Sequence, residues 1–136
     1  MYLIDTNIFL EVLLDQERKS ECLEFLKGVE NGQFRCVVTS FTVHSIAVIM
    51  DARKLVRALR IFLETLRRMK GLTVYSTSLE DEIKVLEVME KYNLDFDDAL
   101  QAYVASIFGA TVVSFDDDFD KLDFIERKTP ADVLKS

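Results

Sequence analysis

The stretch that decides the fold stands at the start of the chain and reads Tyr2-Leu3-Ile4-Asp5-Thr6-Asn7. Its apolar and aromatic residues predict a short buried strand at 2–4, and the polar residues that follow mark a loop. The same order recurs near the other end, where Thr111-Val112-Val113-Ser114-Phe115 precedes Asp116-Asp117-Asp118. A third acidic segment, Leu94-Asp95-Phe96-Asp97-Asp98, opens an apolar helical stretch from Ala99 to Phe108. Carboxylates therefore border apolar segments at three separate points of the chain.

Strands and helices are predicted to alternate between these points. We expect further strands at 34–39 and 73–76, with a short fifth strand at Phe124-Ile125. Helices are expected at 8–14, around 22–26, from 40 or 42 to 50, from 51 to about 70, at 79–92, and from 97 or 98 to 108. In the helix at 79–92, Ile83, Leu86 and Met89 are expected to face inward. This alternation predicts an α/β fold with a parallel sheet covered by helices on both faces.

The composition fits one compact domain that spans residues 1–136. A chain of 136 residues, 49% apolar and 30% charged, can bury a core without disulfides or a structural metal. Cys22 and Cys36 lack the spacing of metal ligands, and we expect both to be buried free thiols. We see neither a signal-peptide pattern nor an apolar run that could cross a membrane. We therefore expect a cytoplasmic protein with no membrane partner.

The charge distribution bears on binding to nucleic acid. A net charge of −7 argues against a protein that coats nucleic acid non-specifically. It does not exclude an enzyme that acts on nucleic acid, because a bound metal supplies positive charge locally. One helix face is basic and carries Arg53, Arg57 and Arg60. This face is either an ordinary solvated surface or a contact for RNA phosphates or for an acidic partner segment.

The three acidic segments predict a shared metal site. Each one alone has an ordinary explanation, because Asp and Asn are common in loops and at helix N-termini. A parallel sheet, however, brings the carboxyl ends of its strands to one edge, where ligands collect. Carboxylates gathered there repel one another unless a cation or hydrogen bonds compensate. Oxygen ligands favour Mg²⁺ or Mn²⁺ over zinc, so we expect one of these ions.

Taken together, the three segments resemble the PIN-domain family in order and spacing, and the resemblance extends over the whole chain to Thr129-Pro130. It implies a three-layer α/β/α sandwich with a parallel sheet of four or five strands. It implies a nuclease that hydrolyses RNA phosphodiester bonds with Mg²⁺ or Mn²⁺, and in prokaryotes a role as the toxin of a VapBC-type toxin–antitoxin pair. A homodimer and an antitoxin protein are the partners implied beside the RNA substrate. The apolar residues Phe9, Leu10, Leu13 and Leu14 belong to the core or form a groove for an antitoxin helix.

The resemblance also assigns roles to residues. Asp5, Asp98 and Asp116 match the catalytic metal ligands. Asp97 and Asp118 are further candidate ligands, and Asp97 takes the place of Asp98 if the alignment is shifted by one. The residues expected to orient these carboxylates through hydrogen bonds are Thr6, Asn7 and Ser114.

One position departs from the family pattern. A Glu is expected in the helix after the second strand, but residues 40–50 contain no acid, and His44 or Ser45 stands near the expected place. The alternative to a nuclease is therefore a catalytically degenerate PIN domain that acts as an RNA-binding or protein-interaction module. A phosphate-accepting receiver domain is disfavoured, because Ser76-Thr77-Ser78 follows the third strand where an acceptor Asp would be needed.

Overall fold

The computed structural model describes all residues from Met1 to Ser136 and contains five strands, seven α-helices and one 3-10 helix. The strands are β1 (Tyr2–Ile4), β2 (Cys36–Thr39), β3 (Leu72–Tyr75), β4 (Thr111–Val113) and β5 (Arg127–Lys128). The helices are α1 (Thr6–Leu13), α2 (Lys19–Glu30), α3 (Ser40–Ala52), α4 (Val56–Arg68), α5 (Leu79–Tyr92), α6 (Phe96–Phe108), the 3-10 helix η1 (Asp117–Lys121) and α7 (Pro130–Lys135). None of the helices is both long and apolar enough to cross a membrane.

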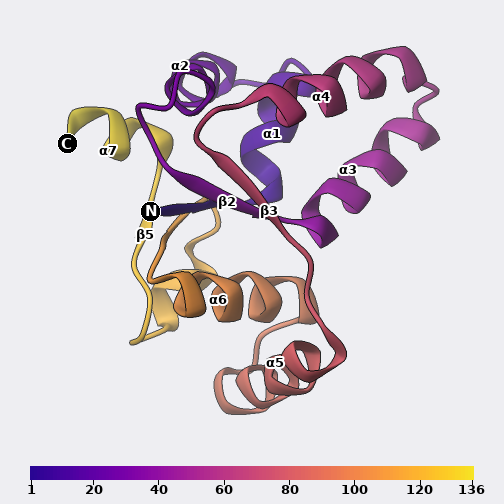
Figure 1. The fold of residues 1–136 in the computed structure, drawn as a ribbon. Helices are drawn as coiled ribbons and strands as arrows, with labels where there is room; N and C mark the ends of the chain where they lie inside the picture. Colours follow the sequence, from indigo (N-terminus) through magenta and orange to yellow (C-terminus); the bar gives the residue numbers. More distant parts are fainter.

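The five strands form one parallel sheet in the order β3-β2-β1-β4-β5. Its two faces are covered by different helices, with α1 to α4 on one side and α5 and α6 on the other (Figure 1). Alternate strand residues serve the two layers: Ile4 packs in the core under α1 to α4, whereas Leu3 packs in the core under α5 and α6. The predicted α/β/α sandwich with a parallel sheet is therefore confirmed.

The register of the sheet brings three chain segments to one edge. Ile4 at the end of β1 pairs with Val113 at the end of β4, and Leu3 pairs with Val37 in β2. Because the strands are parallel, the residues that follow β1, β2 and β4 leave the sheet at the same edge. This edge carries Asp5 and the loop from Ser114 to Asp118.

Three helices begin near this edge, and each has a polar cap. Asp5 caps α1, Thr39 caps α3 and Asp95 caps α6, each with a side-chain oxygen that accepts a backbone N–H of the first turn. These caps explain why α1 begins at Thr6 instead of residue 8, and α6 at Phe96 instead of Asp97 or Asp98.

The fifth strand lies at Arg127–Lys128, and its prediction at Phe124-Ile125 is wrong. The apolar pattern was misleading because the ring of Phe124 packs on Tyr92, with ring centroids 5.4 Å apart. The backbone beside β4 comes from the following residues: the Val112 N–H donates to the Glu126 carbonyl, and the Ser114 N–H donates to the Lys128 carbonyl. Charged residues suit an edge strand, where they discourage pairing with other chains.

Two helical predictions also need correction. Asp51 does not begin a helix: α3 continues to Ala52, and Lys54, with φ of 59°, separates it from α4 at Val56. On α5, Ile83 and Leu86 are 61% and 48% exposed, and the fully buried residue is Val85. Of the three residues expected to face inward there, only Met89 packs against the core.

Both cysteines are buried and free, as predicted. Burial raises the pKa of the Cys22 and Cys36 thiols to about 12, so both stay protonated at neutral pH. Cys22 lies in α2 and Cys36 in β2, and both belong to the core under α1 to α4. They act as small apolar residues in this core.

Candidate metal centre

Asp5 is held at the end of β1 by three hydrogen bonds. Its Oδ1 accepts the Thr6 backbone N–H at 2.8 Å, while Oδ2 accepts the Ser114 hydroxyl at 2.6 Å and the Asn7 amide at 3.3 Å. The residue is only 5% exposed. A buried carboxylate needs such donors, because water no longer solvates its charge.

Ser114 connects the two central strands at this edge. Besides donating to Asp5, its Oγ accepts the Asp116 backbone N–H at 2.9 Å and the Asn7 amide at 3.2 Å. The Oδ1 of Asn7 in turn accepts a hydrogen bond from the Phe115 backbone N–H at 3.5 Å. The loop after β4 is thus fastened to the loop after β1, and both Asn7 and Ser114 donate hydrogen bonds to Asp5. Thr6 contributes its backbone, whereas its hydroxyl pairs with that of Thr42 at 3.0 Å.

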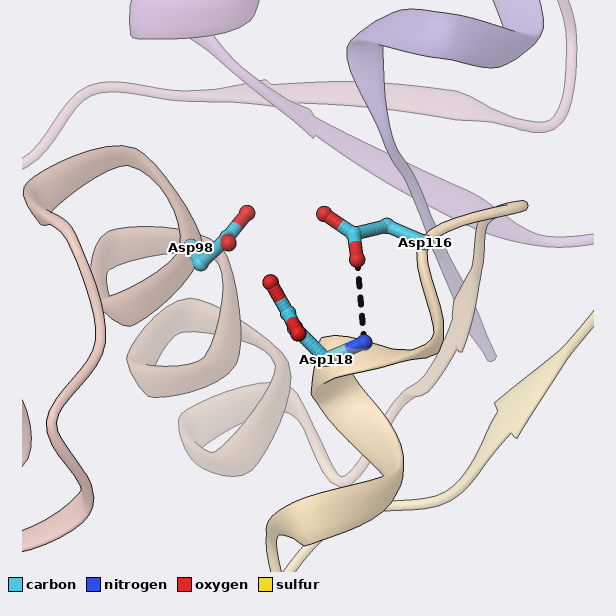
Figure 2. A group of neighbouring side chains, drawn as sticks. All are labelled: Asp98, Asp116 and Asp118. Carbon is cyan, nitrogen blue, oxygen red and sulfur yellow. Dashed lines mark hydrogen bonds between the residues drawn. The ribbon is translucent and has the colours of Figure 1, made fainter.

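A second group of carboxylates faces this position. Asp98, Asp116 and Asp118 each offer one oxygen, and these three oxygens lie within 4.8 Å of one another. Figure 2 shows Asp98 pointing from α6 toward the two aspartates of the β4–η1 segment. Asp116 Oδ1 accepts the Asp118 N–H at 2.9 Å, which bends the chain so that both carboxylates face the same way. The start of α6 and the segment after β4 therefore form one acidic cluster, made of Asp98, Asp116 and Asp118.

The pKa values of these carboxyls reflect their crowding. Burial raises the pKa of Asp98 to about 7, and the charges of neighbouring Asp95, Asp116 and Asp5 add to the effect. Burial likewise raises the pKa of Asp5 to about 6, against the hydrogen bonds from Ser114 and Thr6. Asp97 also has a raised pKa, chiefly from burial. The group would be stabilised by a cation placed among its oxygens.

The donor set fits a hard divalent cation. All the gathered ligands are carboxylate oxygens, which suit Mg²⁺ or Mn²⁺. Two oxygens on opposite sides of one Mg²⁺ lie about 4.2 Å apart, since each bond is about 2.1 Å long. The spacing within 4.8 Å therefore needs only small side-chain rotations to enclose an ion. The only basic side chain that forms a salt bridge with these carboxylates is Lys121. Its exposed Nζ lies 3.3 Å from Asp118 Oδ1.

Neither candidate for the missing α3 acid joins this acidic cluster. His44 is exposed, and together with Ser45 it lines a shallow hollow beside Phe41. The α3 residue that faces the site region is Thr42, which is fully buried and contacts Thr6. Asp51, the one acidic residue of α3, is exposed at the far end of the helix, so residues 40–50 offer no counterpart of the expected Glu.

Sequence reasoning missed a buried polar link under the site. Gln101 is fully buried on α6, and its amide nitrogen donates to the Thr42 hydroxyl at 2.5 Å and to Asp97 at 3.4 Å. Its carbonyl oxygen Oε1 has no hydrogen-bond partner. The available signal was a Gln on the otherwise apolar face of α6, three residues after Asp98.

The predicted basic residues lie apart from the carboxylates. Arg53, Arg57 and Arg60 are exposed and surround the turn between α3 and α4. In Figure 1 this turn is at the upper right, at the outer end of the α3–α4 pair. They are separate from the acidic cluster.

Comparison with known proteins agrees with the fold. The sequence profile of the PIN domain matches residues 2–125, and the chain belongs to the PIN-domain family. No curated protein sequence matches it significantly.

Solved structures of similar fold include toxin proteins. VapC20 of Mycobacterium tuberculosis, described as a Sarcin-Ricin loop cleaving toxin, has a TM-score of 0.74 at 17% identity, covering 93% of this chain and 98% of that chain. A chain of VapBC2 from Rickettsia felis, solved with a DNA fragment from its promoter, has a TM-score of 0.71 at 17% identity, covering 94% and 97%. A chain of a toxin–antitoxin complex from Klebsiella pneumoniae has a TM-score of 0.71 at 18% identity, covering 96% and 98%.

Proposed function

We propose that the protein is a cytoplasmic, metal-dependent ribonuclease, formed by a single PIN domain of residues 1–136, that serves as the toxin of a toxin–antitoxin pair. The observation that carries the proposal is the set of carboxylates at one sheet edge. Asp98, Asp116 and Asp118 converge within 4.8 Å, and Asp5 is close enough for its charge to raise the pKa of Asp98. Such a set of oxygens suits Mg²⁺ or Mn²⁺, whose charge in turn attracts a phosphodiester.

Each residue of the site has a distinct part in this proposal. Asp5, Asp98 and Asp116 hold the ion, with Asp118 as a further ligand and Asp97 as a second candidate. A bound divalent ion neutralises phosphate charge and makes water more acidic. Ser114 and Asn7 orient Asp5, and the Thr6 N–H fixes its second oxygen. In the metal-free protein, burial raises the pKa of Asp5 to about 6 and that of Asp98 to about 7, and a bound cation would lower both and favour the charged, ligating form.

An apolar pocket supports the antitoxin as a partner. The pocket, of about 330 Å³, lies among α1, α2 and α4 and is lined mainly by Phe9, Leu13, Leu26, Ile61 and Phe62. Ile61 at its rim is 66% exposed, and Lys27 and Glu30 add charged groups. Pockets of this kind accept the apolar face of an amphipathic helix. We propose that an antitoxin helix binds here, so Phe9 and Leu13 serve both the core and the groove.

The basic turn supports a contact with the RNA backbone. Arg53, Arg57 and Arg60 carry no salt bridge and are free to bind phosphates. Replacing Arg57 and Arg60 with Gln should weaken RNA binding and reduce its salt dependence, by a slope of about one for each lost phosphate contact. Binding measured at several salt concentrations tests this, and an unchanged slope would exclude the contact.

A homodimer is also proposed. Leu79, Ile83 and Leu86 form an exposed apolar stripe on α5, at the spacing of one helix face. Burying this stripe against a second copy would remove it from water. Light scattering should give twice the monomer mass for the natural protein and the monomer mass for Ile83→Asp. A monomeric natural protein would exclude the dimer.

The alternative is a degenerate PIN domain that binds RNA or protein without catalysis. The observation that favours it is the absence of an acid among residues 40–50. The two functions differ in whether they require a metal ion. The carboxylates of the nuclease bind the ion and support cleavage, whereas the degenerate domain binds its partner without it.

Incubation with labelled RNA distinguishes the two. Metal-stripped protein is supplied with Mg²⁺ or Mn²⁺ beside the variants Asp5→Asn and Asp98→Asn. We expect cleavage that requires the ion and is lost in both variants. Cleavage no greater than that of the variants, with either ion, would exclude the nuclease and favour the binding module.

A further inference from the structure

Arg127 on β5 makes three hydrogen bonds with a single guanidinium. Its Nε and Nη2 donate to the two carboxylate oxygens of Asp120, both at 2.9 Å, and its Nη1 donates to the Ser114 carbonyl at 3.1 Å. The side chain is 18% exposed, although its partner Asp120 is half exposed. Two parallel bonds to one carboxylate give an arginine pair a fixed geometry.

These bonds connect both ends of the segment that carries two of the converging carboxylates. Ser114 begins the segment after β4, Asp120 lies in η1, and Asp116 and Asp118 stand between them. Inside the segment, the Asp116 N–H donates to Ser114 Oγ and the Asp118 N–H donates to Asp116 Oδ1. Arg127 thus bridges the two ends of the segment, and the two internal hydrogen bonds fix the backbone between them.

No other cation near the segment makes equivalent contacts. Lys121 is exposed and makes one ion pair with Asp118 at 3.3 Å. Lys128, the next residue on β5, reaches only Glu126, at 3.8 Å. Arg127 alone joins η1 to the end of β4.

We propose that Arg127 is a positioning residue, which holds Asp116 and Asp118 opposite Asp98 by tying Asp120 to the Ser114 carbonyl, and thereby sets the affinity for the divalent ion. The inference rests on the proposed metal-dependent function. Asp116 and Asp118 carry like charges and repel Asp98, so the segment tends to move outward when nothing holds it. A guanidinium can hold a carboxylate and a carbonyl at once, whereas a lysine ammonium lacks this planar fork.

Titration of Mn²⁺ into metal-stripped protein tests the proposal. The variants are Arg127→Gln, Arg127→Lys and Asp120→Asn, with Lys128→Gln as the control from the same strand. We expect Arg127→Gln to weaken Mn²⁺ binding by about tenfold or more, the size usual for residues that orient metal ligands. Arg127→Lys and Asp120→Asn should fall between Arg127→Gln and the natural protein, and Lys128→Gln should bind as the natural protein does.

Two further measurements separate positioning from general stabilisation. In the metal-free protein, amide exchange at Asp118 and Phe119 should rise severalfold in Arg127→Gln, while exchange in β1 and β2 stays unchanged. The double variant Arg127→Gln with Asp120→Asn should bind Mn²⁺ no more weakly than Arg127→Gln alone, because the two residues act through one contact. If Arg127→Gln does not fold, Asp120→Asn supplies both measurements.

The outcomes are distinct. If the natural protein does not bind Mn²⁺, the proposed metal-dependent function fails, and this inference fails with it. If the natural protein binds Mn²⁺ and folded Arg127→Gln binds it equally well, only the positioning role is overturned. Uniformly faster exchange throughout the sheet would likewise show a purely structural role.

Discussion

The Ser114 hydroxyl donates a 2.6 Å hydrogen bond to Asp5 Oδ2, joining residues 109 positions apart in the sequence. It does so where β1 and β4 end side by side, and the same Oγ accepts the N–H of Asp116. One small side chain therefore contacts both the Asp5 carboxylate and the Asp116 backbone, and both residues are proposed to bind metal. Its position explains why a small hydroxyl residue directly follows β4.

Replacing Ser114 by Ala should weaken the site without unfolding the protein. Asp5 would lose its shortest hydrogen bond, which normally lowers its pKa, so more of it would be protonated at neutral pH. We expect Mn²⁺ affinity to fall about tenfold and the free energy of unfolding to fall by about 1–2 kcal/mol. Calorimetric titration and urea denaturation measure the two effects. Ser45→Ala, on α3, is the control, and equal Mn²⁺ binding by both variants would contradict the role of Ser114.

The metal-free protein should lose stability as pH rises from about 4.5 to 7.5. Asp5 and Asp98 have folded-state pKa values of about 6 and about 7, above their ordinary value of 3.8. Between these values the folded state binds more protons than the unfolded state, so rising pH favours unfolding. One pKa unit corresponds to about 1.4 kcal/mol, so the total loss is on the order of a few kcal/mol. Urea denaturation across this pH range measures it.

Asp98→Asn and added Mn²⁺ provide the controls for this pH effect. The variant should show a flatter pH profile and a more stable metal-free protein at pH 7.5, because a buried charge is removed. Mn²⁺ should stabilise the natural protein most at the upper end of the range, since protons compete with the metal for the same oxygens. A stability that rises with pH over this range without metal would show that these carboxyls are not crowded.

Substitutions of Thr42 and Gln101 should have strongly non-additive effects on the free energy of unfolding, because the two side chains are hydrogen-bonded. Thr42→Val leaves the buried Gln101 amide without its closest acceptor, and we expect a loss of about 2–3 kcal/mol in the free energy of unfolding. Gln101→Met removes an amide whose carbonyl is already without a partner, so the loss should be about 1 kcal/mol or less. The double variant should be more stable than the sum of the two losses predicts. Strictly additive losses would show that the two side chains do not depend on each other.

A substitution at the rim of the apolar groove should abolish antitoxin binding without lowering the stability of the protein. Ile61 is 66% exposed at the rim of the pocket, so Ile61→Asp should change the free energy of unfolding by no more than about 0.5 kcal/mol. The same substitution places a charge where an apolar helix face must dock, and should abolish co-purification with a co-expressed antitoxin. Val48→Asp, at an equally exposed site on α3, is the control. Loss of co-purification in both variants, or in neither, would contradict the proposed groove.

Sequence patterns predicted which carboxylates gather at one edge of the sheet, because their places follow from strand ends and helix caps. Asp5 and Asp116 come after short apolar runs, and parallel strands bring such positions to one edge. Only the structure shows which way the neighbouring Asp97 and Asp98 side chains point, because adjacent residues on a helix point about 100° apart. Asp98 faces Asp116 and Asp118, while Asp97 accepts a hydrogen bond from Gln101.

Other features depend on contacts between distant segments, which a single sequence does not reveal. Arg127 was not recognised because its partners, Asp120 and the Ser114 carbonyl, are defined only by how β5 pairs with β4. On α5, apolar residues occur on more than one face, so helical spacing alone could not tell buried Val85 from exposed Ile83. Burial there is decided by the packing of α5 against α6.

The most direct test of the central claim is a calorimetric titration of Mn²⁺ into metal-stripped natural protein and into Asp98→Asn at pH 7.5. If the gathered aspartates form a metal centre, the natural protein will bind the ion with saturation, and Asp98→Asn will bind it at least about tenfold more weakly. Far-ultraviolet circular dichroism confirms that the variant is folded. Absent binding, or equal binding by the two folded proteins, would contradict the metal centre.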